Sequence, residues 1–175
     1  IFTLRKDARW SNGEPVTAQD FVYSWQRLVE PKNSSPFAWF AALSGIENAD
    51  AITKGQMSAD KLGVTATDAN HLKVTLSRPV PWFPSMVANA AMYPVPQKVI
   101  EQNPDSWTAP GKLVGNGAYQ LQDRVVNEKI VLVRHQHYWD NSHSVLTKVT
   151  FIPINEESRA TTLYRSGDID LTESF

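Results

Sequence analysis

Four histidines are the side chains in this sequence best suited to hold a metal ion: His71, His135, His137 and His143. His135 and His137 alternate at the end of an expected strand, so their rings would share a face. Zinc sites use three or four protein ligands, yet no carboxylate or third histidine stands at a recognisable spacing from this pair. We therefore interpret the histidines as surface or strand-edge residues, and we expect neither a metal site nor a cofactor.

Two pairs of carboxylates could support acid–base chemistry: Glu156 with Glu157, and Asp168 with Asp170. Such pairs act as acid and base when their surroundings separate their pKa values. The first pair lies where a helix is expected to begin, and acidic residues there complement the helix dipole. The second pair follows a glycine turn at the start of an expected strand. We assign structural roles to both pairs.

The residues of a nucleophilic enzyme are not recognisable. The sequence has no cysteine, which excludes a thiol nucleophile, a disulfide framework and cysteine-based metal centres. It has no Gly-x-Ser-x-Gly turn, and Gly115 and Gly117 lack the spacing and the lysine of a phosphate-binding loop. We therefore expect no catalytic residues.

Charge and composition describe an ordinary globular protein. The chain of 175 residues has 17 basic and 18 acidic side chains, a net charge of −1. This balance gives no electrostatic reason to expect nucleic acid or an anionic membrane as a partner. No apolar stretch approaches the roughly 20 residues that a membrane-spanning helix needs.

Aromatic residues are frequent, with six tryptophans. Most stand in patterned segments and are expected to pack in the interior: Trp10, Trp25, Trp82, Trp107 and Trp139. Phe37 and Trp39 differ, because they lie in a loop directly after Ser34-Ser35-Pro36. Aromatic loops on a rigid scaffold can form ligand pockets, while core packing remains an equal alternative for these rings.

The elements that position these residues follow from local patterns. Thr17 as N-cap, Asp20 three residues later and Pro31 predict a helix over residues 18–30. Further helices are expected over 47–54, 82–90, 97–102 and 155–166, and strands over 1–4, 64–66, 71–76, 130–134, 148–154 and 168–175. The last strand would complete a β–α–β unit, so the fold is mixed α/β. Extended patterns at both ends suggest an excerpt of a longer protein, and residues 93–96 are the best candidate for a linker.

A series of short motifs then resembles a known family. The motifs are Trp10-Ser11-Asn12-Gly13, Pro15-Val16-Thr17-Ala18-Gln19-Asp20, Pro79-Val80-Pro81-Trp82-Phe83, Asn116-Gly117-Ala118-Tyr119, Tyr138-Trp139-Asp140-Asn141 and Arg165-Ser166-Gly167-Asp168-Ile169-Asp170. In order, and over essentially the whole chain, they resemble the periplasmic oligopeptide- and dipeptide-binding proteins of ABC importers. Residues 37–43 and 154–158 are similar to the murein-tripeptide-binding branch of that family.

The resemblance implies a fragment of a three-domain fold of the type II periplasmic binding protein kind. Residues 1–96 would form most of the extra domain, and residues 97–175 part of the first lobe. Phe37 and Trp39 are the expected peptide-binding residues on one side. Glu173, Ser174 and Phe175 are expected at the cleft, and the Glu173 carboxylate could pair with a cationic group of the ligand.

The function that the resemblance implies is capture without chemistry. A monomeric receptor in the periplasm would bind an oligopeptide, including murein tripeptide, and deliver it to the permease of an ABC importer. Two alternatives remain open at this point. One is a hydrolase of peptides or cell-wall fragments, and the other is a receptor of the same fold for a dipeptide, a nickel chelate or haem.

Overall fold

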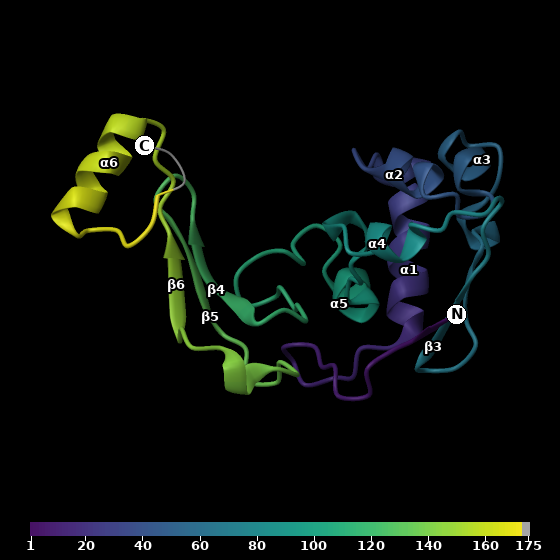
Figure 1. The fold of residues 1–175 in the computed structure, drawn as a ribbon, viewed down its shortest axis with the longest axis horizontal. Helices are drawn as coiled ribbons and strands as arrows, with labels where there is room; N and C mark the ends of the chain where they lie inside the picture. Colours follow the sequence, from purple (N-terminus) through teal and green to yellow (C-terminus); the bar gives the residue numbers. More distant parts are fainter. Residues whose placement is uncertain (173–175) are drawn as a thin grey trace.

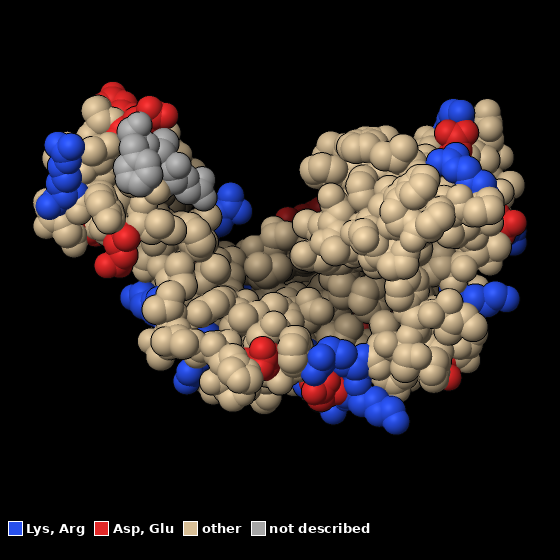
Figure 2. All heavy atoms as spheres, in the orientation of Figure 1, with Lys and Arg blue, Asp and Glu red and all other residues tan. Residues whose placement is uncertain are grey.

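The computed structural model describes residues 1–172 as two arms (Figure 1). A helical arm is centred on α1 (Ala18–Val29), and a sheet arm is centred on β4 (Tyr119–Val125), β5 (Lys129–Arg134) and β6 (Lys148–Phe151). The space-filling view shows that the surface is hollowed between the two arms (Figure 2). Within residues 1–172, no helix is both long and apolar enough to cross a membrane.

Short elements surround α1. The helical arm also contains β1 (Phe2–Thr3), α2 (Ala38–Leu43), α3 (Ala49–Thr53), β2 (Val64–Ala66), β3 (His71–Val74), α4 (Phe83–Met86), α5 (Gln97–Gln102) and the 3-10 turns η1 (Pro31–Asn33), η2 (Ala59–Lys61) and η3 (Ala90–Met92). The sheet arm adds η4 (Asn141–His143) and α6 (Glu157–Ser166). The mixed α/β character expected from the sequence is confirmed.

Helix α1 begins and ends where its local signals predict. The Asp20 carboxylate accepts hydrogen bonds from the backbone N–H of Thr17 at 2.7 Å and from its hydroxyl at 3.0 Å, which ties the first turn to its cap. Glu30 leaves the helical conformation directly before Pro31, as expected for a residue that precedes proline. Val22, Trp25 and Val29 lie on one buried face of the helix.

This face packs on a small antiparallel sheet with the strand order β1-β3-β2. Leu72 of the central strand pairs with Phe2 on one side and Ala66 on the other, and it is fully buried. Gly63 precedes the sheet where a Cβ atom would lie 2.7 Å from the Cβ of Glu47 and 2.8 Å from the carbonyl oxygen of Thr75. Only glycine allows the chain to pass this close to its neighbours.

The segment that leaves this core is tied to α1 by two hydrogen bonds. The indole N–H of Trp25 donates to the carbonyl of Met92 at 2.9 Å, and the Ser24 hydroxyl donates to the carbonyl of Tyr93 at 2.7 Å. Both donor residues are buried, so the proline-rich segment 93–96 starts from a fixed position. Buried polar groups that lack such partners are costly.

The sheet arm is a second antiparallel sheet with the order β4-β5-β6. Its base contacts the N-terminal segment of the chain. The Ser11 N–H donates to the Gly115 carbonyl at 2.8 Å, and the Arg5 guanidinium lies 3.5 Å from the centre of the Trp139 ring. Cation–π stacking and a backbone hydrogen bond thus connect the two arms.

Among the predicted elements, two differ most in the structure. The helix expected over residues 82–90 ends at Met86, because Asn89 accepts the Ala91 N–H at 2.9 Å and begins η3 instead. The strand expected from Asp168 is not formed over residues 168–172. There the N–H groups of Asp168 and Ile169 donate to the carbonyl of Leu163 at the end of α6, so they cannot pair with a neighbouring strand.

We predict that Trp25→Phe lowers the free energy of unfolding by about 2–4 kcal/mol, because it leaves the Met92 carbonyl without its donor and opens a void. Trp82→Phe is the matched control. Trp82 is 61% exposed, so its loss should change stability by no more than about 0.5 kcal/mol. Urea-induced unfolding measures both changes, and equal effects would contradict the assigned role of Trp25.

Candidate functional site

The helical arm presents an exposed aromatic surface, which we define as Phe37, Trp39, Leu43 and Trp82. Phe37 is 53% exposed and Trp39 is 58% exposed, although both belong to or cap the short helix α2. Trp39 contacts Phe40 edge to face, with ring centres 5.7 Å apart. Core packing, which the sequence left open for Phe37 and Trp39, does not occur in the described part of the chain.

Hydrogen bonds place α2 beside the segment that leads to α4. The Ser77 N–H donates to the Gly45 carbonyl at 2.9 Å, and the Arg78 guanidinium donates to the Leu43 carbonyl at 3.3 Å. Trp82 is the N-cap of α4, and its exposure corrects the expectation that it is buried. Residues 33–46 have no charged side chain and residues 74–97 have only Arg78, so the aromatic surface is nearly uncharged.

The second group of expected site residues lies outside the described residues: Glu173, Ser174 and Phe175. The described chain ends at Thr172, after α6 of the sheet arm. Helix α2, which contains Trp39 and is capped by Phe37, belongs to the arm on one side of the hollow, and α6 belongs to the arm on the other side (Figures 1 and 2).

The histidines include one that sequence reasoning placed wrongly. His135 is 1% exposed, although a surface or strand-edge position was expected. Its Nδ1 lies 2.7 Å from the carbonyl oxygen of Gly117, which fixes this nitrogen as the donor. Its backbone N–H donates to Ala118. The burial comes from a segment almost twenty residues away in the chain, so no local pattern could reveal it.

Other candidate reactive groups have structural partners. Among residues 1–172, no three His, Asp or Glu side chains are grouped closely enough to hold a metal ion. His143 pairs with Asp140, and hydrogen bonding to this carboxylate raises the pKa of His143. Glu156 and Glu157 lie at the start of α6, as predicted. The Ser166 hydroxyl donates to Asp168 at 2.5 Å.

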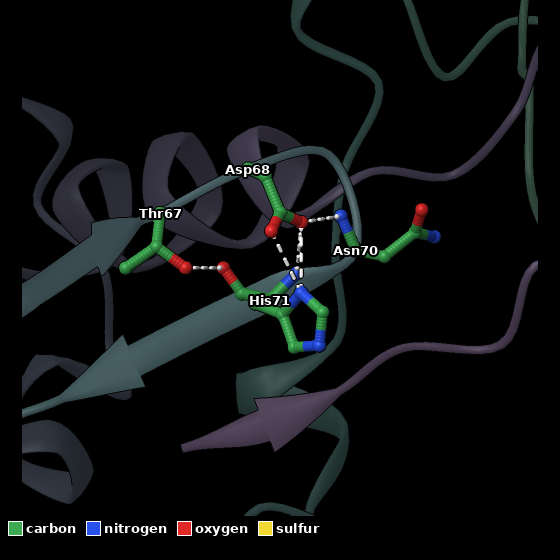
Figure 3. Close-up of polar contacts among 4 residues, drawn as sticks. All are labelled: Thr67, Asp68, Asn70 and His71. Carbon is green, nitrogen blue, oxygen red and sulfur yellow. Dashed lines mark hydrogen bonds and ion pairs between the residues drawn. The ribbon is translucent and has the colours of Figure 1, made fainter.

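Asp68 and His71 stabilise the β2–β3 turn and do not form a catalytic relay (Figure 3). Asp68 accepts the Asn70 N–H at 2.8 Å and the His71 N–H at 3.0 Å, and its carboxylate lies 2.8 Å from His71 Nδ1. The Thr67 hydroxyl is directed to the His71 backbone carbonyl and not to its ring. Hydrogen bonds hold the pKa of Asp68 below its ordinary value. The backbone N–H of Asn70 has the largest effect, and the side chain of His71 has the next largest.

Comparison with known proteins gives the context for this arrangement. The family model of the bacterial extracellular solute-binding proteins, family 5 (middle), matches residues 1–175. The chain belongs to this family. It is similar to the periplasmic murein peptide-binding protein MppA of Escherichia coli (strain K12). The two are 62% identical over 174 residues, which are 99% of this chain and 32% of MppA. The periplasmic oligopeptide-binding protein OppA of the same organism is 49% identical over 173 residues, 99% of this chain and 32% of OppA.

Solved structures of such solute-binding proteins have the same fold. The unliganded open form of the murein tripeptide-binding protein MppA superimposes with a TM-score of 0.96 and 61% identity, over 99% of this chain and 33% of that one. Haemophilus influenzae OppA in complex with the peptide RPPGFSPFR gives a TM-score of 0.93 and 42% identity, over 96% and 33%. The chain spans about a third of the length of these relatives.

We predict a pH-dependent effect of Asp68→Asn, in which the amide imitates the protonated acid. Because the pKa of Asp68 is lowered by folding, its contribution to stability is complete above its ordinary value of 3.8 and is lost as the pH falls further. The variant should therefore melt at a lower temperature than the parent at neutral pH, and the two melting curves should converge in acid. Asp105→Asn, at an exposed carboxylate, is the control and should not change the melting temperature.

Proposed function

We propose that this chain is part of an extracytoplasmic receptor that captures oligopeptides, including murein tripeptide. The observation that carries the proposal is the 62% identity to the murein peptide-binding protein MppA over 99% of the chain. The geometry supports it, because the arm that carries this exposed, nearly uncharged aromatic surface borders a hollow. Such surfaces can accept the apolar side chains of a peptide.

The peptide-binding residues that we propose come from both sides of the hollow. Phe37 and Trp39 provide rings for ligand side chains, because more than half of each residue's surface is free. Glu173, Ser174 and Phe175 follow the described end of the sheet arm. The Glu173 carboxylate would pair with a cationic ligand group, such as the amine of diaminopimelate, by a charge-assisted hydrogen bond.

The wider assignment follows the same proposal. Residues 1–96 form most of the extra domain and residues 97–175 part of the first lobe of the longer protein. That protein acts in the periplasm as a monomer, where it binds peptide without chemical change and delivers it to the permease of an ABC importer. Support for the periplasmic location comes from the periplasmic relatives. Peptide binding would select a closed arrangement of the lobes.

Calorimetric titration of the full-length protein tests the proposal, with an L-tripeptide and murein tripeptide as separate ligands. We expect saturable binding that Phe37→Ala weakens by about fivefold or more, as for an aromatic contact residue. Tyr164→Ala is the control, because Tyr164 is similarly exposed but lies on α6. Glu173→Gln should weaken murein tripeptide more than the L-tripeptide. Absence of binding for both ligands would contradict the proposal.

A further inference from the structure

The sheet arm contains an apolar cavity that is separate from the aromatic surface. The cavity has a volume of about 360 Å³ and lies between the β4–β5 hairpin and the loop that follows α5. Leu121, Ile130 and Leu132 form its strand wall, and Thr108 and Leu113 form its loop wall. A volume of this order is typical of pockets for small organic ligands, which range from roughly 300 to 1,000 Å³.

A bulge in β4 decides which charged residue reaches this cavity. Leu121 pairs with Leu132, but the next paired residue of β4 is Asp123, opposite Val131, so Gln122 is the extra residue. Regular alternation would place Asp123 on the face of Leu121. The bulge instead places Arg124 opposite Ile130, on the cavity face. The cavity therefore receives a guanidinium group in place of a carboxylate.

The two cations of this hairpin have different surroundings. Lys129, on the opposite face, lies 3.7 Å from Asp123 and 3.6 Å from Glu128. Arg124 has no ion pair or side-chain hydrogen bond within residues 1–172, although it lines the apolar cavity. A guanidinium group offers five N–H donors in a planar fork that matches a carboxylate. The unpaired guanidinium group of Arg124 beside apolar walls is complementary to a ligand with one anionic and one apolar end.

We propose that this cavity binds a small amphipathic anion, with its apolar body against Leu121, Ile130 and Leu132 and its carboxylate on Arg124. The cavity is separate from the aromatic surface, because it is built from β4, β5 and the 103–118 loop, and the aromatic surface is built from α2 and α4. A receptor with both sites can hold a peptide and an amphipathic anion at the same time.

The test is calorimetric titration of the full-length protein with decanoate, and with decanol as the uncharged probe. We expect saturable, one-to-one binding of decanoate and weaker binding of decanol. Arg124→Gln should weaken decanoate binding by about tenfold or more, because it removes a charge-assisted hydrogen bond. Lys129→Gln is the matched control, since it removes a cation from the other face of the same hairpin, and it should leave the affinity unchanged.

A second variant examines the apolar wall. Ile130→Thr keeps a β-branched side chain in the strand but reduces the apolar area, so it should weaken both probes. Three results would overturn the proposal: no saturable binding of decanoate, equal weakening by Arg124→Gln and Lys129→Gln, or displacement of decanoate by a saturating tripeptide. Decanoate would also fail to bind if another segment of the longer protein filled the cavity, and that result would overturn the proposal as well. The first two results do not depend on whether the peptide titration succeeds.

Discussion

The indole N–H of Trp25 reaches the carbonyl of Met92 inside the core of the helical arm, and most of the architecture depends on this contact. Trp25 also packs edge to face against Phe21 and Phe83, so its ring joins α1 to α4 as well as to the exit of the chain. With Met92 and Tyr93 held at α1, segment 93–96 has one starting point and α5 packs back on α1. The loop after α5 then meets Ser11 at the base of the sheet arm.

The two arms differ in how well they are packed. The aromatic surface belongs to a well-packed arm, while the sheet arm has few buried side chains of its own and exposes Ile130, Phe151 and Ile152. The chain spans about a third of the length of its relatives, and apolar surface of this extent on a soluble protein marks places where something else packs or binds.

Sequence reasoning succeeds where the signal is local. The cap at Thr17 and the stop at Pro31 each act within a few residues, and the structure confirms the helix that they predict. It fails where distant segments decide. His135 is buried by Gly117 and Ala118, and the strand expected from Asp168 loses its backbone donors to the end of α6. For the site, the loop position of Phe37 and Trp39 left exposure and core packing equally open, and exposed Trp82 looked like any core tryptophan.

We propose that the protein holds a peptide without changing it. The most direct measurement is mass spectrometry of a peptide incubated with the full-length protein, separated from unbound peptide and released by denaturation. We predict one intact peptide per protein molecule, even after prolonged incubation. Recovery of cleaved fragments would indicate a hydrolase, and a protein that retains no peptide would contradict the receptor assignment itself.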